Sequence, residues 1–189
     1  MKVRQNIAVV ALMLGLVAGV LAGCEASDEF APKQRTQIER YLAGKDADYT
    51  LVGDSVFVYV AGNRLATEGT LPAQPATLAV GDGVVFNFEA YTFTSNPATK
   101  PYYTNKEWLM AKFYPDFDYS YWDFSPRSIR LGEGAILKGL EEALVGRMEG
   151  DSVVVFLTSD NGYGDHDMGA VERNTALMWV LNVEQVEKK

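Results

Sequence analysis

The chain has 189 residues, of which 48% are hydrophobic and 12% aromatic, and its formal net charge at pH 7 is −8. This apolar fraction is typical of a globular protein and excludes a disordered chain. The acidic balance argues against nucleic acid and anionic lipid headgroups as partners. Cys24 is the single cysteine, so the chain can form no internal disulfide bond.

The N-terminus has the order of a secretory signal. Lys2 and Arg4 form a short positive region, and residues 7–20 form an apolar run too short to cross a ~30 Å hydrocarbon layer comfortably as a permanent helix. The sequence Leu-Ala-Gly-Cys that ends at Cys24 resembles the bacterial lipobox, in which the cysteine receives a diacylglyceryl group and becomes the mature N-terminus. We therefore predict a lipoprotein signal peptide over residues 1–23; the alternative is an ordinary signal with an incidental cysteine.

The lipobox predicts a location as well as a modification. The mature protein is expected in the bacterial cell envelope, anchored to a membrane by acyl chains such as palmitate at Cys24, with the outer membrane favoured. Two or three acyl chains hold a protein stably, whereas a single chain binds only marginally.

Residues 24–45 are expected to form a lipidated tether and a short helix. A proline in the first turn is compatible with a helix start, and Ile38, Tyr41 and Leu42 follow at a spacing that places them on one helix face. We predict a helix over residues 32–43 that docks this apolar face on the domain.

The remaining residues, 46–189, are predicted to form one domain built mainly of β-strands, because apolar and polar residues alternate in several segments. Strands are expected at residues 55–60, 84–93, 128–131, 153–157 and 176–186. Residues 61–80 and 160–174 are rich in turn-forming residues and predict loops.

One segment of this domain has clear helical spacing. The predicted helix runs from Gly134 to about Gly146, and its apolar face carries Ile136, Leu137, Leu140 and Leu144. Antiparallel strands with one crossing helix predict an α+β fold in which the helix covers one face of the sheet.

A long aromatic stretch separates the second and third of these predicted strands. Residues 95–105 are rich in turn formers, residues 107–113 predict one or two helical turns, and residues 114–122 are dense in aromatic side chains.

The residues that follow this stretch match the pattern of a known family. Residues 129–144 read Ile-Arg-Leu-Gly-Glu-Gly-Ala-Ile-Leu-Lys-Gly-Leu-Glu-Glu-Ala-Leu, followed by Gly-Asp-Ser-Val at 150–153 and Asn-Gly-Tyr-Gly at 161–164. This resembles the FKBP-type peptidyl-prolyl isomerases, because Leu-Gly, Lys-Gly and Tyr-Gly fall at the family's spacing together. The likeness covers about residues 80–186, interrupted by an insertion near residues 95–124. The lipoprotein setting is similar to that of a bacterial branch of the family.

The resemblance implies a fold and an activity. The fold is an FKBP-like curved antiparallel β-sheet wrapped around one amphipathic helix, here with an N-terminal helical extension. The activity is cis–trans isomerisation of X–Pro bonds, in which an apolar aromatic pocket favours the twisted amide over the planar one. That chemistry needs no cofactor, and its partners are proline-containing polypeptides. We expect a monomer that acts as an isomerase or folding helper for exported proteins.

The resemblance also implies a set of site residues. Those in catalytic positions are Tyr163, Asp118, Phe88 and Trp179. Those in substrate-binding positions are Phe117, Ile136, Leu137, Leu140 and Val171, and the backbone N–H of Leu137 would meet a substrate carbonyl.

The site departs from the family pattern in ways that leave alternatives open. Phe88 stands where Tyr is usual, Trp179 where Phe is usual, and Leu140 where many members have Trp. The family's Phe-Asp pair is assigned to Phe117-Asp118, but an alternative alignment places it at residues 102–105, which lack the acid. The alternatives to an isomerase are therefore a binding protein of the same fold with weak or no activity, and a structural accessory of an outer-membrane complex.

Other kinds of site have weaker support in the sequence. His166, the only histidine, lies between two aspartates, but a metal site needs three or four ligands, so a solvated loop is favoured. Glu141 and Glu142 are expected on the solvent face of the predicted helix, which argues against a hydrolytic carboxylate pair.

Overall fold

The computed structural model describes residues 30–189. The predicted signal peptide at residues 1–23, Cys24 and the start of the tether lie outside the described residues. Within residues 30–189, every helix is too short or too polar to cross a membrane.

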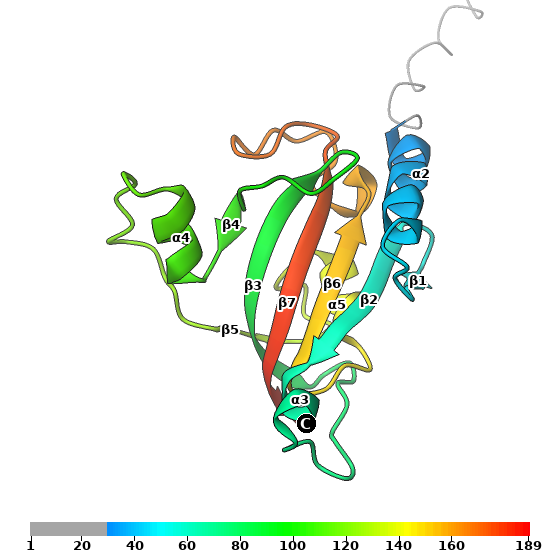
Figure 1. The fold of residues 1–189 in the computed structure, drawn as a ribbon, viewed down its shortest axis with the longest axis vertical. Helices are drawn as coiled ribbons and strands as arrows, with labels where there is room; N and C mark the ends of the chain where they lie inside the picture. The colour runs from blue at the N-terminus through cyan, green and yellow to red at the C-terminus, as the bar shows by residue number, and fades with distance from the viewer. Residues whose placement is uncertain (1–29) are drawn as a thin grey trace, which may run out of the picture.

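The core of the protein is a seven-stranded antiparallel sheet with the strand order β1-β2-β6-β7-β3-β4, in which β5 also pairs with β3 (Figure 1). The strands are β1 (Thr50–Val52), β2 (Val56–Asn63), β3 (Gly83–Phe93), β4 (Tyr103–Thr104), β5 (Arg127–Arg130), β6 (Asp151–Leu157) and β7 (Ala176–Glu187). The longest pairing joins β3 to β7, from Gly83 opposite Glu187 to Phe93 opposite Ala176. The predicted antiparallel sheet is confirmed.

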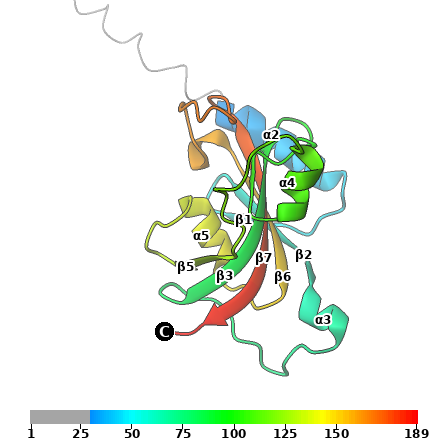
Figure 2. The same cartoon turned by 90° about the vertical axis from the view of Figure 1, so that its left-hand side faces the viewer.

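Within residues 30–189, four helices and one short 3₁₀ turn surround this sheet. They are α2 (Phe30–Ala43), α3 (Arg64–Glu68), α4 (Glu107–Phe113), α5 (Lys138–Leu144) and η1 (Ser159–Asn161). The two views show α5 and α2 on opposite sides of the sheet, and α4 beyond β3 with β4 (Figures 1 and 2). The N-terminal helix predicted over residues 32–43 is confirmed, because α2 covers that range.

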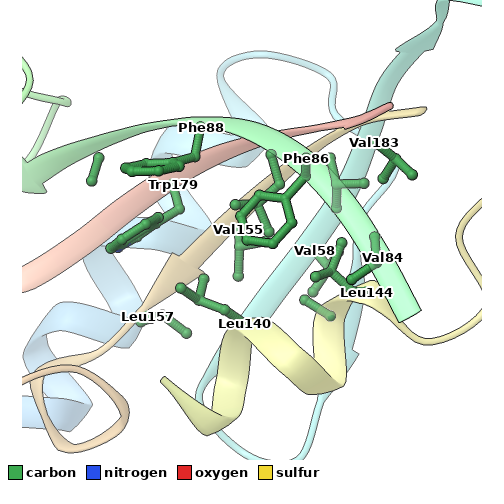
Figure 3. Close-up of a cluster of buried hydrophobic side chains, with 14 of the residues drawn as sticks. Val58, Val84, Phe86, Phe88, Leu140, Leu144, Val155, Leu157, Trp179 and Val183 are labelled. Carbon is green, nitrogen blue, oxygen red and sulfur yellow. The ribbon is translucent and has the colours of Figure 1, made fainter. Parts of the chain in front are cut away.

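The inner face of the sheet packs against α5 and forms the larger core. Side chains alternate along each strand, so β3 sends Val84, Phe86 and Phe88 to this face, where they meet Leu140 and Leu144 of α5 (Figure 3). The two leucines are fully buried. This helix therefore holds the curved sheet from its inner side, as the resemblance implies.

The outer face of the sheet is covered at one end by α2. Ile38 and Leu42 are fully buried there in a second cluster that includes Phe57, Phe93 and Phe156. The ring of Phe93 packs edge-on against Phe156, with 5.2 Å between the ring centroids. Burial of such rings stabilises the fold by about 1.5–3 kcal/mol each.

One buried side chain fixes α2 to the loop between β6 and β7. The Gln34 amide donates to the carbonyl of Asn174 at 2.7 Å, and its carbonyl oxygen accepts from the N–H of Ser159 at the same distance. The helix is therefore held at both its apolar face and a polar anchor.

The helix α5 is shorter than the sequence predicts. It starts at Lys138 instead of Gly134, because the Glu141 carboxylate accepts hydrogen bonds from the N–H groups of Gly132 and Ala135, both at 2.8 Å. Gly134 has φ +72°, which is incompatible with a right-handed helix. Glu141 is only 7% exposed, so its predicted place on the solvent face is wrong.

Two short elements were not predicted. Residues 61–80 were expected to be a loop, but they contain α3, whose N-cap Asn63 accepts from the N–H of Ala66 at 3.0 Å. In the segment expected to be all turns, β4 adds to the edge of β3, with Tyr103 opposite Ala90.

Candidate active site

A hollow of about 220 Å³ lies between the inner face of the sheet and the start of α5. Its walls are mostly apolar, and they come from β3, β4, β7, the start of α5 and the loop after β6. A concave, mostly apolar pocket with a few polar groups is the usual form of a binding site.

Three aromatic side chains form the sheet side of this pocket. Phe88 of β3 lies against Trp179 of β7 at 5.5 Å between ring centroids and against Tyr103 of β4 at 4.7 Å. Tyr103 and Trp179 are 6.3 Å apart and nearly perpendicular. Figure 3 shows Phe88 and Trp179 side by side above Leu140. Rings held in this mutual packing form a rigid wall.

The opposite wall comes from the segment that leads into α5. Ile136 and Leu137 line the pocket there, and the fully buried Leu140 lies below them. Glu141 holds the loop before Ile136 by the hydrogen bonds described above. A carboxylate outside the pocket therefore sets the position of the edge formed by Ile136 and Leu137, here called the lip of the pocket. Within residues 30–189 the N–H of Leu137 donates to no other protein group, which leaves it available to a ligand.

Close packing of α5 on the sheet depends on Gly139. A Cβ at this position would lie 2.8 Å from Leu157 and 2.9 Å from Val56. Such a contact would force either these side chains or the helix to shift, which would disturb the packing next to the pocket.

Tyr163 brings a hydroxyl to the pocket from the loop after η1. Its loop is held by the N–H of Gly164, which donates to Ser159 at 2.8 Å. The Tyr163 hydroxyl lies 3.5 Å from that of Tyr102. Burial, and secondarily the Tyr163 hydroxyl, raise the pKa of Tyr102 far above its usual value, so Tyr102 stays protonated.

The indole of Trp179 carries an unsatisfied polar group. Its ring is 6% exposed, and its Nε1 is buried without a hydrogen bond to any described residue. Tyr102 lies beside this ring, at 6.2 Å between centroids, and the nearby indole N–H slightly offsets the rise in the pKa of Tyr102.

Part of the chain is similar to a known family. Residues 114–184 match the family of FKBP-type peptidyl-prolyl cis-trans isomerases. This part of the chain is similar to that family. It is 32% identical over 71 residues to FK506-binding protein 2 of Podospora anserina, and 28% identical over 72 residues to that of Aspergillus fumigatus. Each alignment covers 38% of this chain, and they span 38% and 54% of the two relatives.

Solved structures show the same fold. A peptidyl-prolyl cis-trans isomerase from Pseudomonas syringae superposes with a TM-score of 0.55 at 15% identity, over 88% of this chain and all of the other. The N-terminal domain of FKBP42 from Arabidopsis thaliana gives a TM-score of 0.53 at 12% identity, over 76% of this chain and 94% of that domain. These likenesses establish the FKBP-like fold.

The pocket brings together most of the residues that the resemblance assigned to the site. Those lining it are Phe88, Ile136, Leu137, Leu140, Tyr163 and Trp179. Val171 instead lies in the core, at 1% exposure, and does not line the pocket.

Phe117 and Asp118 lie outside the pocket. The family match includes them, since it begins at Tyr114, but Phe117 is 49% exposed and Asp118 lies on an exposed turn. The Asp118 carboxylate accepts from the hydroxyl of Ser120 at 2.7 Å and from its N–H at 3.0 Å. These bonds lower the pKa of Asp118, so this acid is occupied locally and faces solvent.

The alternative alignment at residues 102–105 fits the geometry of the pocket better. Tyr103 lines the wall, and the next two residues fasten it to β3. The Thr104 hydroxyl donates to the carbonyl of Phe88 at 2.7 Å, and the Asn105 side chain accepts from the N–H of Phe88 at 2.8 Å. In that alignment, the tyrosine ring of Tyr103 takes the place of the acid of the family pair.

Three lining residues were missed by the sequence analysis: Phe86, Ala135 and Arg127. Phe86 could have been found, because it is two residues from Phe88 in the same strand and therefore on the same face. Arg127 donates to the hydroxyl of Tyr103 at 3.4 Å, a contact across the insertion that no local pattern signals.

The remaining polar clusters do not resemble a metal centre. Within the described residues, no group of three or more His, Cys, Asp or Glu side chains converges. His166 is exposed, and its Nδ1 lies 3.3 Å from the Asp165 carboxylate and 3.0 Å from the Tyr163 carbonyl oxygen.

Proposed function

We propose that this protein catalyses cis–trans isomerisation of X–Pro bonds in polypeptides, acting as a folding helper for exported proteins. The observation that carries the proposal is the aromatic and aliphatic pocket formed by Phe88, Trp179 and Ile136, with the Tyr163 hydroxyl and the Leu137 N–H at its edge. The similarity of residues 114–184 to the FKBP-type peptidyl-prolyl cis-trans isomerases supports it.

The pocket suits this reaction because rotation about an amide needs no nucleophile. The barrier of ~18–20 kcal/mol comes from amide resonance, which is lost in the twisted form. The twisted amide carries less charge separation than the planar one, so apolar walls such as Phe88 and Trp179 favour it. Each ~1.36 kcal/mol of this preference increases the rate tenfold.

Two polar groups would orient the substrate. The Leu137 N–H is free to donate to a backbone carbonyl, and the Tyr163 hydroxyl can donate to a second one. Tyr102 supports the Tyr163 ring edge-on at 6.3 Å. The proline ring would then lie between these donors and the aromatic wall.

The proposal is tested by the isomerisation rate of a short X–Pro peptide with the full chain and with Tyr163→Phe. Loss of one hydrogen bond of about 0.5–1.5 kcal/mol predicts a fall in kcat/KM of about 2- to 10-fold. Tyr91→Phe is the matched control, because its hydroxyl lies on the outer face and donates to Glu89. A wild-type protein that is folded but gives no acceleration would contradict the proposal.

A second candidate is a proline-peptide-binding protein without isomerase activity. The observation that favours it is the place of Asp118, which lies outside the pocket on an exposed turn. Saturable binding of the same peptide without acceleration would support this candidate over the enzyme.

We further propose that the protein is a monomeric lipoprotein of the bacterial cell envelope, anchored through Cys24. The sequence of residues 1–24 supports this placement. Cells fed labelled palmitate should label the wild-type protein but not Cys24→Ser. Equal labelling of both would refute the anchor.

A further inference from the structure

The insertion carries exposed aromatic side chains directly beside the pocket. We propose that residues 114–124, here called the aromatic arm, bind the part of an unfolded polypeptide that flanks the isomerised proline. The preferred segment has aromatic or aliphatic side chains and no net negative charge. This inference rests on the proposed isomerase function and names the substrate class of that same site.

A chain of ring contacts connects the pocket to the arm. Tyr103, which lines the pocket, packs edge-on against Trp122 at 5.7 Å between centroids. Trp122 in turn packs edge-on against Phe117 at 6.0 Å. A peptide leaving the pocket past Tyr103 would therefore meet further aromatic surface without a break.

The far end of this chain is open to solvent. Phe117, at the end of the ring contacts, is 49% exposed, and Tyr121, which precedes Trp122 in the sequence, is 98% exposed. Single exposed apolar residues are common on proteins, but a group continuous with a pocket is typical of a binding surface. Tyrosine and tryptophan are also the residues that contribute most to protein recognition.

The arm is held in place before any ligand binds. The Trp122 indole donates to the carbonyl of Thr104 at 2.8 Å, and Tyr114 donates to that of Pro101 at 2.7 Å. The Asn105 amide donates to the carbonyl of Ser125 at 3.0 Å, which joins the two ends of the insertion. A surface fixed in this way loses little conformational entropy on binding.

The charge of the arm defines its partner further. It contains Asp116, Asp118 and Asp123 and no lysine or arginine. Hydrogen bonds from Ser120 and from Ser125 lower the pKa of Asp118 and of Asp123, respectively, so both are ionised at neutral pH. These charges repel acidic peptides, anionic membranes and a second copy of this acidic chain.

The test uses two lengths of X–Pro peptide. The short one has four residues, and the long ones add an aromatic segment with either basic or acidic residues beside it. In the double variant Phe117→Ala/Tyr121→Ala, the ratio of kcat/KM for the long basic peptide to that for the short peptide should fall at least about fivefold. Trp108→Ala is the matched control, since this 60% exposed tryptophan lies on α4 outside the ring chain.

The outcomes of this test either support the proposal for the aromatic arm or overturn it. In the wild type, the long basic peptide should have a lower KM than the long acidic one, by a margin that shrinks in high salt. An unchanged ratio in the double variant, or an equal fall in Trp108→Ala, would overturn the inference. A wild-type dimer that the double variant dissociates would also overturn it, by making the arm a self-association surface.

The proposed function and this inference fail in different ways. If the wild type does not accelerate the short peptide, the isomerase reading fails. The arm is then judged by the Kd of the fluorescently labelled long basic peptide, which should still rise in the double variant. An unchanged Kd would overturn the inference by itself.

Discussion

The two faces of the central sheet are formed by the same strands but have different roles. Along β7, Leu177, Trp179 and Leu181 face α5, whereas Ala176 and Met178 face α2. The outer face is closed by a helix of 14 residues, but the inner face meets a helix of only seven. The shorter helix leaves the pocket uncovered at its start, so one side of each strand builds the site and the other stabilises it.

This comparison predicts that substitutions on the two faces have separable effects. Outer-face substitutions should change the free energy of unfolding without changing catalysis by the folded protein. Inner-face substitutions near the pocket should change both.

The largest effect on stability is expected for Phe156→Ala. This fully buried ring packs under α2 against Phe93 and Tyr41, and its removal should lower the free energy of unfolding by about 3–5 kcal/mol. Urea unfolding measures this loss. The folded variant should keep wild-type kcat/KM, and a parallel loss of activity would show that the two faces are coupled.

Gly139→Ala should lower the free energy of unfolding less than Phe156→Ala does, but it should also affect the pocket. The added Cβ meets Leu157 and Val56 at under 3 Å, and overpacking of this kind costs about 1–3 kcal/mol. Because either α5 or these side chains must shift, kcat/KM for a short X–Pro peptide should fall as well. Lost stability with unchanged kinetics would mean that the helix position does not set the pocket.

Glu141→Gln should change the lip of the pocket, at Ile136 and Leu137, with a smaller loss of stability than Gly139→Ala. The amide keeps the shape of the side chain but weakens the charge-assisted bonds from Gly132 and Ala135, for an expected loss of about 1–2 kcal/mol. KM should rise because Ile136 and Leu137 are less firmly held. Glu142→Gln, on the more exposed neighbour, is the control and should leave KM unchanged.

The smallest effect concerns acid stability at a position away from both faces. Hydrogen bonds from the Lys188 side chain and the Lys189 and Ala79 backbone lower the pKa of Asp82 to about 2. Its unfolded pKa is about 3.9, so its contribution is complete above about pH 5 and disappears as the pH falls through about 2.

Asp82→Asn should therefore be less stable than the wild type at neutral pH, and the two should converge near pH 2. Urea unfolding across this range measures the difference. A constant difference at every pH would show that the contribution of Asp82 is not its charge.

The alternation of apolar residues in strands and their spacing in helices predicted most of the fold. Alternation located β3, β6 and β7, and the spacing of Ile38 and Leu42 located α2. These signals are local, since each depends on residues in one strand or helix that face one core.

The failures occur where a distant partner decides the structure. The start of α5 depends on the buried carboxylate of Glu141, which competes with helix formation before Lys138. The pocket wall at Tyr103 depends on Thr104 and Asn105 binding to β3 across the insertion. Sequence spacing contains no signal for either contact.

The most direct test of the account compares kcat/KM for a short X–Pro peptide in Trp179→Ala and Phe156→Leu. These side chains lie on opposite faces of the same sheet, in β7 and β6. The account predicts that the wild type accelerates isomerisation, that Trp179→Ala loses about tenfold or more, and that Phe156→Leu retains wild-type kinetics while folded. Equal kinetics in Trp179→Ala and the wild type would contradict the account.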